Sequence, residues 1–225
     1  MKLRTLLLIQ IIFSVLSFNL RQTKEKQYYD SLVLALNWPN GYGRVNGNEA
    51  DIDKMKLEDN IFTIHGLWPA LKSGALLNDC TTGVIINEDS SELFKKMKKY
   101  WPNLKDNKNV LFWKHEYNKH GDCMVEEKNW SGYRDYFQYA MDLYLKDYRL
   151  LLQKALGIKK ERKIVTITFE EIKEKIQKII PDATFKMNCK SGIVYEFYFY
   201  LTKNLTPSTT SYFSNSCRSA KLIFK

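Results

Sequence analysis

The run Ile193–Thr202 constrains the fold of this chain more than any other feature of the sequence. Its residues, IVYEFYFYLT, are mostly aromatic or β-branched and include neither glycine nor proline, which is the composition of a long β-strand. Tyr28–Trp38 and Ile61–Trp68 have the same character, and Ala220–Phe224 predicts a short final strand. We therefore expect a β-sheet as one part of the fold.

Helical segments lie between these strands. Four of them combine apolar spacing with helix end signals: Ser91–Tyr100 before Pro102, Val110–His120 before Gly121, Gly132–Leu156 before Gly157, and a helix that starts at the capping box Thr168–Glu171 and ends by Pro181. Glycine is typical just after a helix, and proline cannot continue one. Helices set apart from clustered strands indicate an α+β fold, in which a central antiparallel or mixed sheet packs against several helices.

The start of the chain has the pattern of a secretory signal. Lys2 and Arg4 precede an apolar run over 6–18, which is shorter than the roughly 20 residues that span a bilayer. A cut after Ser17 gives a signal peptide over 1–17 and a single domain over 18–225; cleavage at Asn19 or Leu20, or a buried first helix, is the alternative. No later run is apolar enough to cross a membrane, so we expect a soluble protein that is secreted or delivered to a lysosome or vacuole.

Cysteines and sequons agree with an exported chain. The chain has four cysteines, Cys80, Cys123, Cys189 and Cys217, and none of them forms a C-x-x-C pair. This pattern favours two disulfides over a zinc or redox site, and it leaves three pairings open. Asn129 and Asn204 each begin an N-x-S/T sequon, which is a common chance pattern but permits glycosylation in the secretory pathway.

The net charge suggests a class of partner. The chain has a formal net charge of +10, and a basic surface attracts polyanions such as nucleic acids. A lysine-rich segment such as 95–99 is, by itself, typical of a solvated helix face. Charge is therefore compatible with an RNA partner without identifying it.

The candidate chemistry lies in two short segments, FTIHGLWP at 62–69 and LFWKHEYNKHGDC at 111–123. Together they contain His65, His115 and His120, which are all the histidines of the chain. Any imidazole chemistry must therefore take place where these two segments meet.

The spacing within the second segment favours acid–base chemistry over metal binding. On a helix, Glu116 lies beside His120 and Lys119 beside His115, so that a carboxylate can hold one imidazole while a lysine and an imidazole form an anion site. A zinc protease helix needs H-E-x-x-H, whereas this segment has H-E-x-x-x-H. Five residues place the two imidazoles about 140° apart around a helix, which is a poor arrangement for metal ligands.

These segments closely resemble the two active-site motifs of the ribonuclease T2 family, whose usual forms are close to FTIHGLWP and FWxHEWxKHGTC. The first motif matches over eight consecutive residues, and the second keeps both histidines, the glutamate, the lysine, the glycine and the cysteine. LALNWP at 34–39 also looks like the family's first core strand. The resemblance runs from about Tyr29 to the end of the chain, is strongest in the motifs, and implies a ribonuclease T2-like domain over 18–225.

The resemblance implies an endoribonuclease that cleaves single-stranded RNA without a metal or other cofactor. RNA carries its own nucleophile, the 2′-hydroxyl, so the enzyme only moves protons and neutralises charge. By analogy with the family, His120 is the base and His65 the acid, and the product is a 2′,3′-cyclic phosphate that water opens to a 3′-phosphate.

The remaining motif residues take supporting roles by the same analogy. Glu116 and Lys119 would stabilise the phosphorane, and His115 would donate a hydrogen bond to the phosphate. Trp68 would offer a flat face to a base, a contact worth on the order of 1–3 kcal/mol, or would be a core residue. Mapped by position, the disulfides would join Cys80 to Cys123 and Cys189 to Cys217.

Departures from the family pattern leave the proton-transfer groups in place. Tyr117 and Asp122 replace the common tryptophan and threonine, and Ala70 stands where some fungal relatives have an aspartate that reads adenine. Two alternatives stay open: a catalytically inactive, basic RNA-binding or cytotoxic protein, and a secreted zinc hydrolase. Both proton-transfer histidines are present, which favours an active ribonuclease. We expect it to be a monomer with no stable membrane association.

Overall fold

The computed structural model describes residues 28–80, 83–157, 164–211, 217 and 219–223, so the predicted signal peptide lies outside the described residues.

The strands form one mixed, mainly antiparallel sheet. The strands are β1 (Ser31–Asn37), β2 (Thr63–Ala70), β3 (Ile164–Thr168), β4 (Thr184–Lys190), β5 (Ile193–Thr202) and β6 (Ser219–Ile223). β5 has the bounds that its composition predicts, and β3 and β4 were not predicted. The α+β prediction is confirmed.

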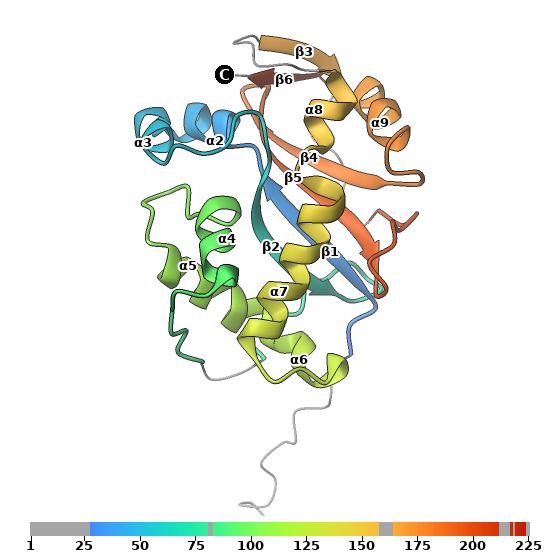
Figure 1. Cartoon of the computed structure of the whole chain (residues 1–225). Helices are drawn as coiled ribbons and strands as arrows, with labels where there is room; N and C mark the ends of the chain where they lie inside the picture. The colour runs from blue at the N-terminus through green and yellow to red at the C-terminus, as the bar shows by residue number, and fades with distance from the viewer. Residues whose placement is uncertain (1–27, 81–82, 158–163, 212–216, 218, 224–225) are drawn as a thin grey trace, which may run out of the picture.

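The sheet places the strand of the first motif, β2, next to β1 and places β5 on the other side of β1. Its order is β2-β1-β5-β6-β3, and β4 pairs with the other side of β5. β1 pairs antiparallel with β2 and with β5, while β6 pairs in parallel with β5 at Ile193 and antiparallel with β3. The aromatic run Ile193–Thr202 is therefore a central strand. It lies next to β1, which in turn neighbours β2, the strand of the FTIHGLWP segment (Figure 1).

Helices lie over one face of this sheet, with α7 running across it (Figure 1). The helical elements are α2 (Pro39–Asn46), α3 (Glu49–Lys54), α4 (Glu92–Tyr100), α5 (Asn109–Glu116), η1 (Tyr117–Gly121), α6 (Asp122–Lys128), α7 (Tyr133–Leu143), η2 (Tyr144–Tyr148), α8 (Leu151–Leu156) and α9 (Phe169–Gln177). The predicted capping box is present at α9, where Thr168 and Glu171 exchange hydrogen bonds. In the described part of the chain no helix is long and apolar enough to span a bilayer.

The two faces of the sheet have different environments. Leu32, Leu34 and Leu36 of β1 belong to the large core beneath the helices. Val33 and Ala35, which alternate with them, join Trp68 and Tyr200 in a small second cluster on the opposite face. This alternation follows from the two-residue period of a strand, and it gives the sheet a second face on which side chains other than the main core can gather.

A β-bulge in β2 brings His65 to that second face. Ala35 pairs with Gly66 and Leu36 pairs with Ile64, so His65 is the extra residue between two successive pairs. A bulge of this kind re-aims a side chain and is common beside active sites. Because the alternation slips by one residue there, Leu67 enters the main core while Trp68 joins His65 on the other side of the sheet.

The second motif forms a continuous helical segment with a π-helical turn in its middle. α5 leads into η1 at Tyr117, and α6 follows directly. The prediction that the helix ends at Gly121 was wrong, because Gly121 has helical angles and the segment continues to Lys128. Its glycine is needed for a different reason: a Cβ atom there would lie 2.8 Å from ring atoms of Tyr136. Short π-helical turns occur frequently at functional sites.

The predicted helix 132–156 is interrupted. α7 passes into the π-helical turn η2, and after a break at Arg149 and Leu150 the chain resumes as α8, which ends just before Gly157. The apolar spacing was sufficient to identify the helical segment, but it carries no signal for this break.

Two disulfides connect the elements around the sheet. Cys80 is bonded to Cys123 and Cys189 to Cys217, which confirms the pairing that the family resemblance implied. The first bond joins the loop after β2 to α6, just beyond the π-helical turn. The second joins β4 to the segment that precedes β6.

Candidate active site

The two motifs meet where the bulge of β2 faces the α5–η1 segment. His65 and Trp68 come from β2, Glu116 from the end of α5, and His120 from η1. The imidazole rings of His65 and His120 both pack against the indole of Trp68, with ring centroids 5.1 and 5.2 Å away. The structure therefore brings the two proposed proton-transfer groups to one site.

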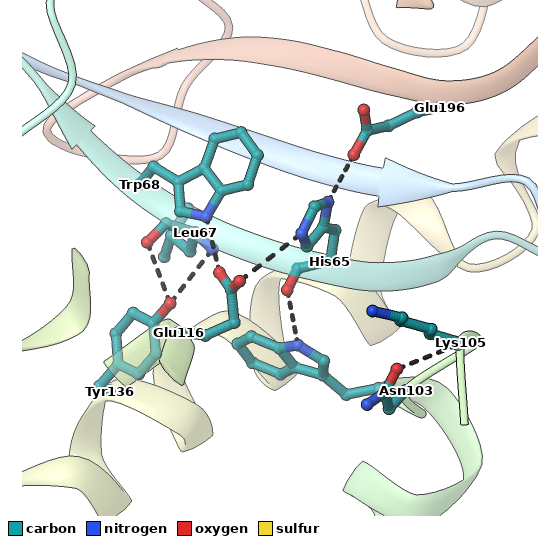
Figure 2. A network of polar contacts seen from close by, with 9 residues as sticks. His65, Leu67, Trp68, Asn103, Lys105, Glu116, Tyr136 and Glu196 are labelled. Carbon is teal, nitrogen blue, oxygen red and sulfur yellow. Dashed lines mark hydrogen bonds and ion pairs between the residues drawn. The ribbon is translucent and has the colours of Figure 1, made fainter. Parts of the chain in front are cut away.

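His65 lies between two buried carboxylates (Figure 2). Its Nδ1 is 2.5 Å from Oε1 of Glu196, and its Nε2 is 3.5 Å from Oε1 of Glu116. Burial lowers the pKa of His65, but the charges of Glu116 and Glu196 together with the hydrogen bond to Glu196 outweigh it, and the net direction is upward. Since the imidazole is about one-third exposed, a protonated His65 can still meet a substrate.

His120 has the opposite environment. It is 4% exposed, and its Nδ1 is 3.1 Å from the carbonyl oxygen of Leu77. A carbonyl only accepts hydrogen bonds, so Nδ1 carries the proton in the neutral ring and Nε2 keeps a free lone pair. Burial lowers the pKa of His120 to about 4, with Lys119 and the other histidines acting in the same direction. Near neutral pH the ring is a base.

Glu116 is held in place by Trp68 (Figure 2). The indole Nε1 donates a hydrogen bond of 2.8 Å to Oε2 of Glu116, which is 2% exposed. Burial raises the pKa of this carboxyl, while His65 and the indole hydrogen bond oppose the increase. The prediction paired Glu116 with His120, and this partner was wrong. The carboxylate of Glu116 instead contacts His65, across the site.

Trp68 has little surface left for a base. It is 5% exposed. The rings of His120 and Tyr198 both pack against its indole, each with ring centroids 5.2 Å apart. These contacts support the core interpretation of Trp68 as a residue that positions Glu116. Base stacking on the indole stays a prediction.

Lys119 and His115 lie at the rim of the site. Together with Asp79, Leu111, Lys114 and Asn118 they line a shallow surface hollow. Lys119 is close enough to influence the pKa values of His65, Glu116 and His120. His115 is exposed and influences the pKa values of Glu116 and His120. A cationic rim next to two imidazoles is suited to a phosphate.

Buried donors fix the backbone of the bulged strand. Trp101 Nε1 donates to the carbonyl oxygen of His65 at 2.8 Å, which supplies a partner to a residue that a bulge removes from the ladder. The Tyr136 hydroxyl of α7 donates to the carbonyl oxygen of Leu67 at 3.1 Å and lies 3.2 Å from its amide nitrogen, which donates to it (Figure 2). Helices and sheet are thus joined directly at the site.

Glu196 is the site residue that the sequence analysis missed. It lies within the strand-forming run of β5 and is 131 positions away from His65 in the sequence. A single carboxylate inside an aromatic strand was the available signal, because a strand interior seldom buries an unpaired charge. The other predicted residues lie at the site or its rim, and among the described residues no cluster of metal-ligating side chains occurs.

The sequons lie on the surface. Asn129 and Asn204 are both exposed, the first just after α6 and the second in the turn after β5. This placement leaves both side chains accessible, and their glycosylation stays a prediction.

Comparison with known proteins agrees with this geometry. The sequence model of the Ribonuclease T2 family matches residues 29–217. Ribonuclease Rh of Rhizopus niveus is 32% identical over 192 residues, which cover 77% of this chain and 73% of that protein. Two solved structures share the fold. The RNase-related protein from Calystegia sepium has a TM-score of 0.72 and 22% identity, and the match covers 88% of this chain and 99% of that one. RNase NT in complex with 5′-AMP has a TM-score of 0.66 and 24% identity, and the match covers 88% of this chain and 100% of that one. On these matches, the chain belongs to the ribonuclease T2 family.

Proposed function

We propose that this protein is an endoribonuclease that cleaves single-stranded RNA by acid–base transphosphorylation, through a 2′,3′-cyclic phosphate to 3′-phosphate ends. Membership of the ribonuclease T2 family supports the activity. The opposed surroundings of His65 and His120 support the mechanism, because two groups whose pKa values are pushed apart can act as acid and base at the same pH.

In the first step His120 is the base. Its Nε2 takes the proton of the 2′-hydroxyl, and the 2′-oxygen attacks phosphorus. The bond from phosphorus to the 5′-oxygen breaks, and Nε2 of His65 donates its proton to the departing oxygen. The ring nitrogen of His120 that faces Leu77 already carries a hydrogen, so Nε2 is the atom available to receive another.

In the second step the two roles are exchanged. Neutral His65 takes a proton from water, the hydroxide attacks phosphorus, and protonated His120 donates to the 2′-oxygen as the cyclic ester opens. Each histidine ends the cycle in the protonation state in which it began. No metal is needed, because RNA supplies the nucleophile and the two imidazoles move the protons.

The rim cations stabilise the charge of the phosphorane. Lys119 adds a positive charge beside both histidines, and His115 is placed to donate to a phosphate oxygen from the surface hollow. Glu116 keeps the imidazolium of His65 paired until the phosphate enters.

The observation that carries this proposal is the pair of imidazoles, one between two carboxylates and the other against a carbonyl. Incubation with RNA and with DNA of the same sequence, each with and without chelator, tests it. The protein should cut the RNA and not the DNA, and it should leave 2′,3′-cyclic or 3′-phosphate ends. Chelator should cause no loss of activity. Fragments with 5′-phosphate ends would refute the mechanism, and an inactive protein that still binds RNA would favour the non-catalytic alternative.

We also propose export through the secretory pathway and action as a monomer. The basic and then apolar start of the chain supports a signal peptide over 1–17, and two disulfides are typical of oxidising compartments. N-terminal sequencing of the protein released from a eukaryotic host should begin near residue 18. Light scattering of that material should give the mass of one chain.

A further inference from the structure

Glu196 is a buried carboxylate for which the proposed steps have no direct use. It lies in the central strand β5, where it pairs with Asn37 of β1 and with Asn188 of β4, and it is 5% exposed. Removing an ionised carboxylate from water is costly unless partners compensate for the lost hydration. The partners of Glu196 therefore indicate what this side chain does.

These partners hold both carboxylate oxygens. Oε1 lies 2.5 Å from Nδ1 of His65, and Oε2 accepts a hydrogen bond of 2.8 Å from Nδ2 of Asn188. The side chain of Tyr198, two residues along the same strand, is also hydrogen-bonded to Glu196. Because each oxygen has a partner on a strand, the carboxylate has a defined direction, and that direction is toward His65.

The contact determines which nitrogen of His65 faces the substrate. With Nδ1 donating to Glu196, the ring directs Nε2 toward Glu116 (Figure 2). Glu116 cannot perform this task, since it faces Nε2, the nitrogen that the departing oxygen must approach. A carboxylate behind the opposite nitrogen orients the ring and stabilises its charged form without obstructing the substrate.

We propose that Glu196 is a positioning residue for the reaction: it orients His65 through Nδ1 and keeps the imidazole protonated, so that Nε2 is ready to donate. This inference rests on the proposed function, in which His65 is the acid. Three charged groups act on His65, namely Glu116 from α5, Lys119 from η1 and Glu196 from β5. Glu196→Gln removes one of the two negative charges and leaves the opposed charges of Glu116 and Lys119.

Histidine titration by NMR tests the proposal independently of activity. A nearby opposite charge shifts a pKa by about 1–3 units, so E196Q should lower the pKa of His65 by about one unit or more. The basic limb of the kcat/KM profile should move to lower pH by the same amount, with KM changed less than about threefold. Glu174→Gln, an exposed carboxylate on α9, is the matched control and should change neither.

The two readouts separate the inference from the proposed function. An unchanged pKa of His65 in folded E196Q would overturn the role of Glu196. A lowered pKa of His65 with an unmoved basic limb of the kcat/KM profile would support the contact between Glu196 and His65. It would refute His65 as the acid. Asn188→Ala keeps the charge and removes one support, so it should reduce kcat severalfold with little change in the pKa of His65. Unchanged kcat in that variant would refute the orienting role.

Discussion

Trp68→Phe distinguishes a tryptophan that supports Glu116 from one that stacks on a base. Phenylalanine keeps an aromatic face but removes the indole N–H, together with one ring of the buried side chain. That N–H donates a hydrogen bond of 2.8 Å to Oε2 of Glu116, a carboxylate that is 2% exposed. A hydrogen bond to a charged group contributes about 1.5–3 kcal/mol. We therefore expect W68F to lower the free energy of unfolding by about 1.5–3 kcal/mol through the lost hydrogen bond, in addition to the cost of the lost ring. Because Glu116 is released, kcat should fall tenfold or more with little change in KM.

Urea unfolding and steady-state kinetics on a defined oligonucleotide measure both effects. Trp38→Phe is the matched control, since Trp38 is also buried. Its indole donates a hydrogen bond of 2.9 Å to the uncharged carbonyl oxygen of Ile223, away from the site. Both variants lose one buried ring, but the lost hydrogen bond of W38F contributes only about 0.5–1.5 kcal/mol. W38F should therefore destabilise the fold by less than W68F and leave kcat unchanged. Normal stability and kcat in W68F, with a raised KM in Trp68→Ala, would refute the supporting role and favour base stacking.

Three further predictions concern pH, packing and the first disulfide. The kcat/KM profile should be bell-shaped, rising as His120 loses its proton near pH 4 and falling as His65 loses its proton above pH 6.5; a profile still rising at pH 8 would contradict the assignment. Gly121→Ala, which helix propensity alone would make stabilising, should instead lower Tm by about 2–10 °C in calorimetry, because the added Cβ meets Tyr136 at 2.8 Å and overpacking costs roughly 1–3 kcal/mol. Replacing Cys80 and Cys123 together by alanine opens a loop whose ends are 43 residues apart and should lower the urea-derived stability by about 4 kcal/mol; a loss under 1 kcal/mol would contradict the loop-closure argument.

Local signals in the sequence were sufficient for several elements. The bounds of β5 follow from its own aromatic and β-branched residues, and the capping box of α9 is formed by residues three positions apart. The disulfide pairing came from the family resemblance, since four cysteines by themselves allow three pairings. These features depend on neighbouring residues or on motifs, and both can be read without knowledge of the fold.

Other features depend on contacts between distant segments. The bulge that turns His65 to the active face is set by the register between β2 and β1, and the role of Glu196 depends on a strand far along the chain. α2, with the sequence PNGYGRVN, resembles a turn, yet Gly41 allows a close approach to the carbonyl of Val194, which a Cβ would reach at 1.7 Å. Such packing determines the structure locally and leaves little trace in the sequence.

The assignment of His65 as the acid and His120 as the base is the central claim, and changing the leaving group tests it most directly. A good leaving group such as p-nitrophenolate departs without a proton, so it removes the need for an acid but not for a base. We therefore predict that His65→Ala, nearly inactive on RNA, regains turnover on uridine 3′-(p-nitrophenyl phosphate), approaching that of the unsubstituted protein. His120→Ala should stay at least about 100-fold slower on both substrates. Recovery of H120A rather than H65A on the activated ester would reverse the two roles, and recovery of neither would contradict the account.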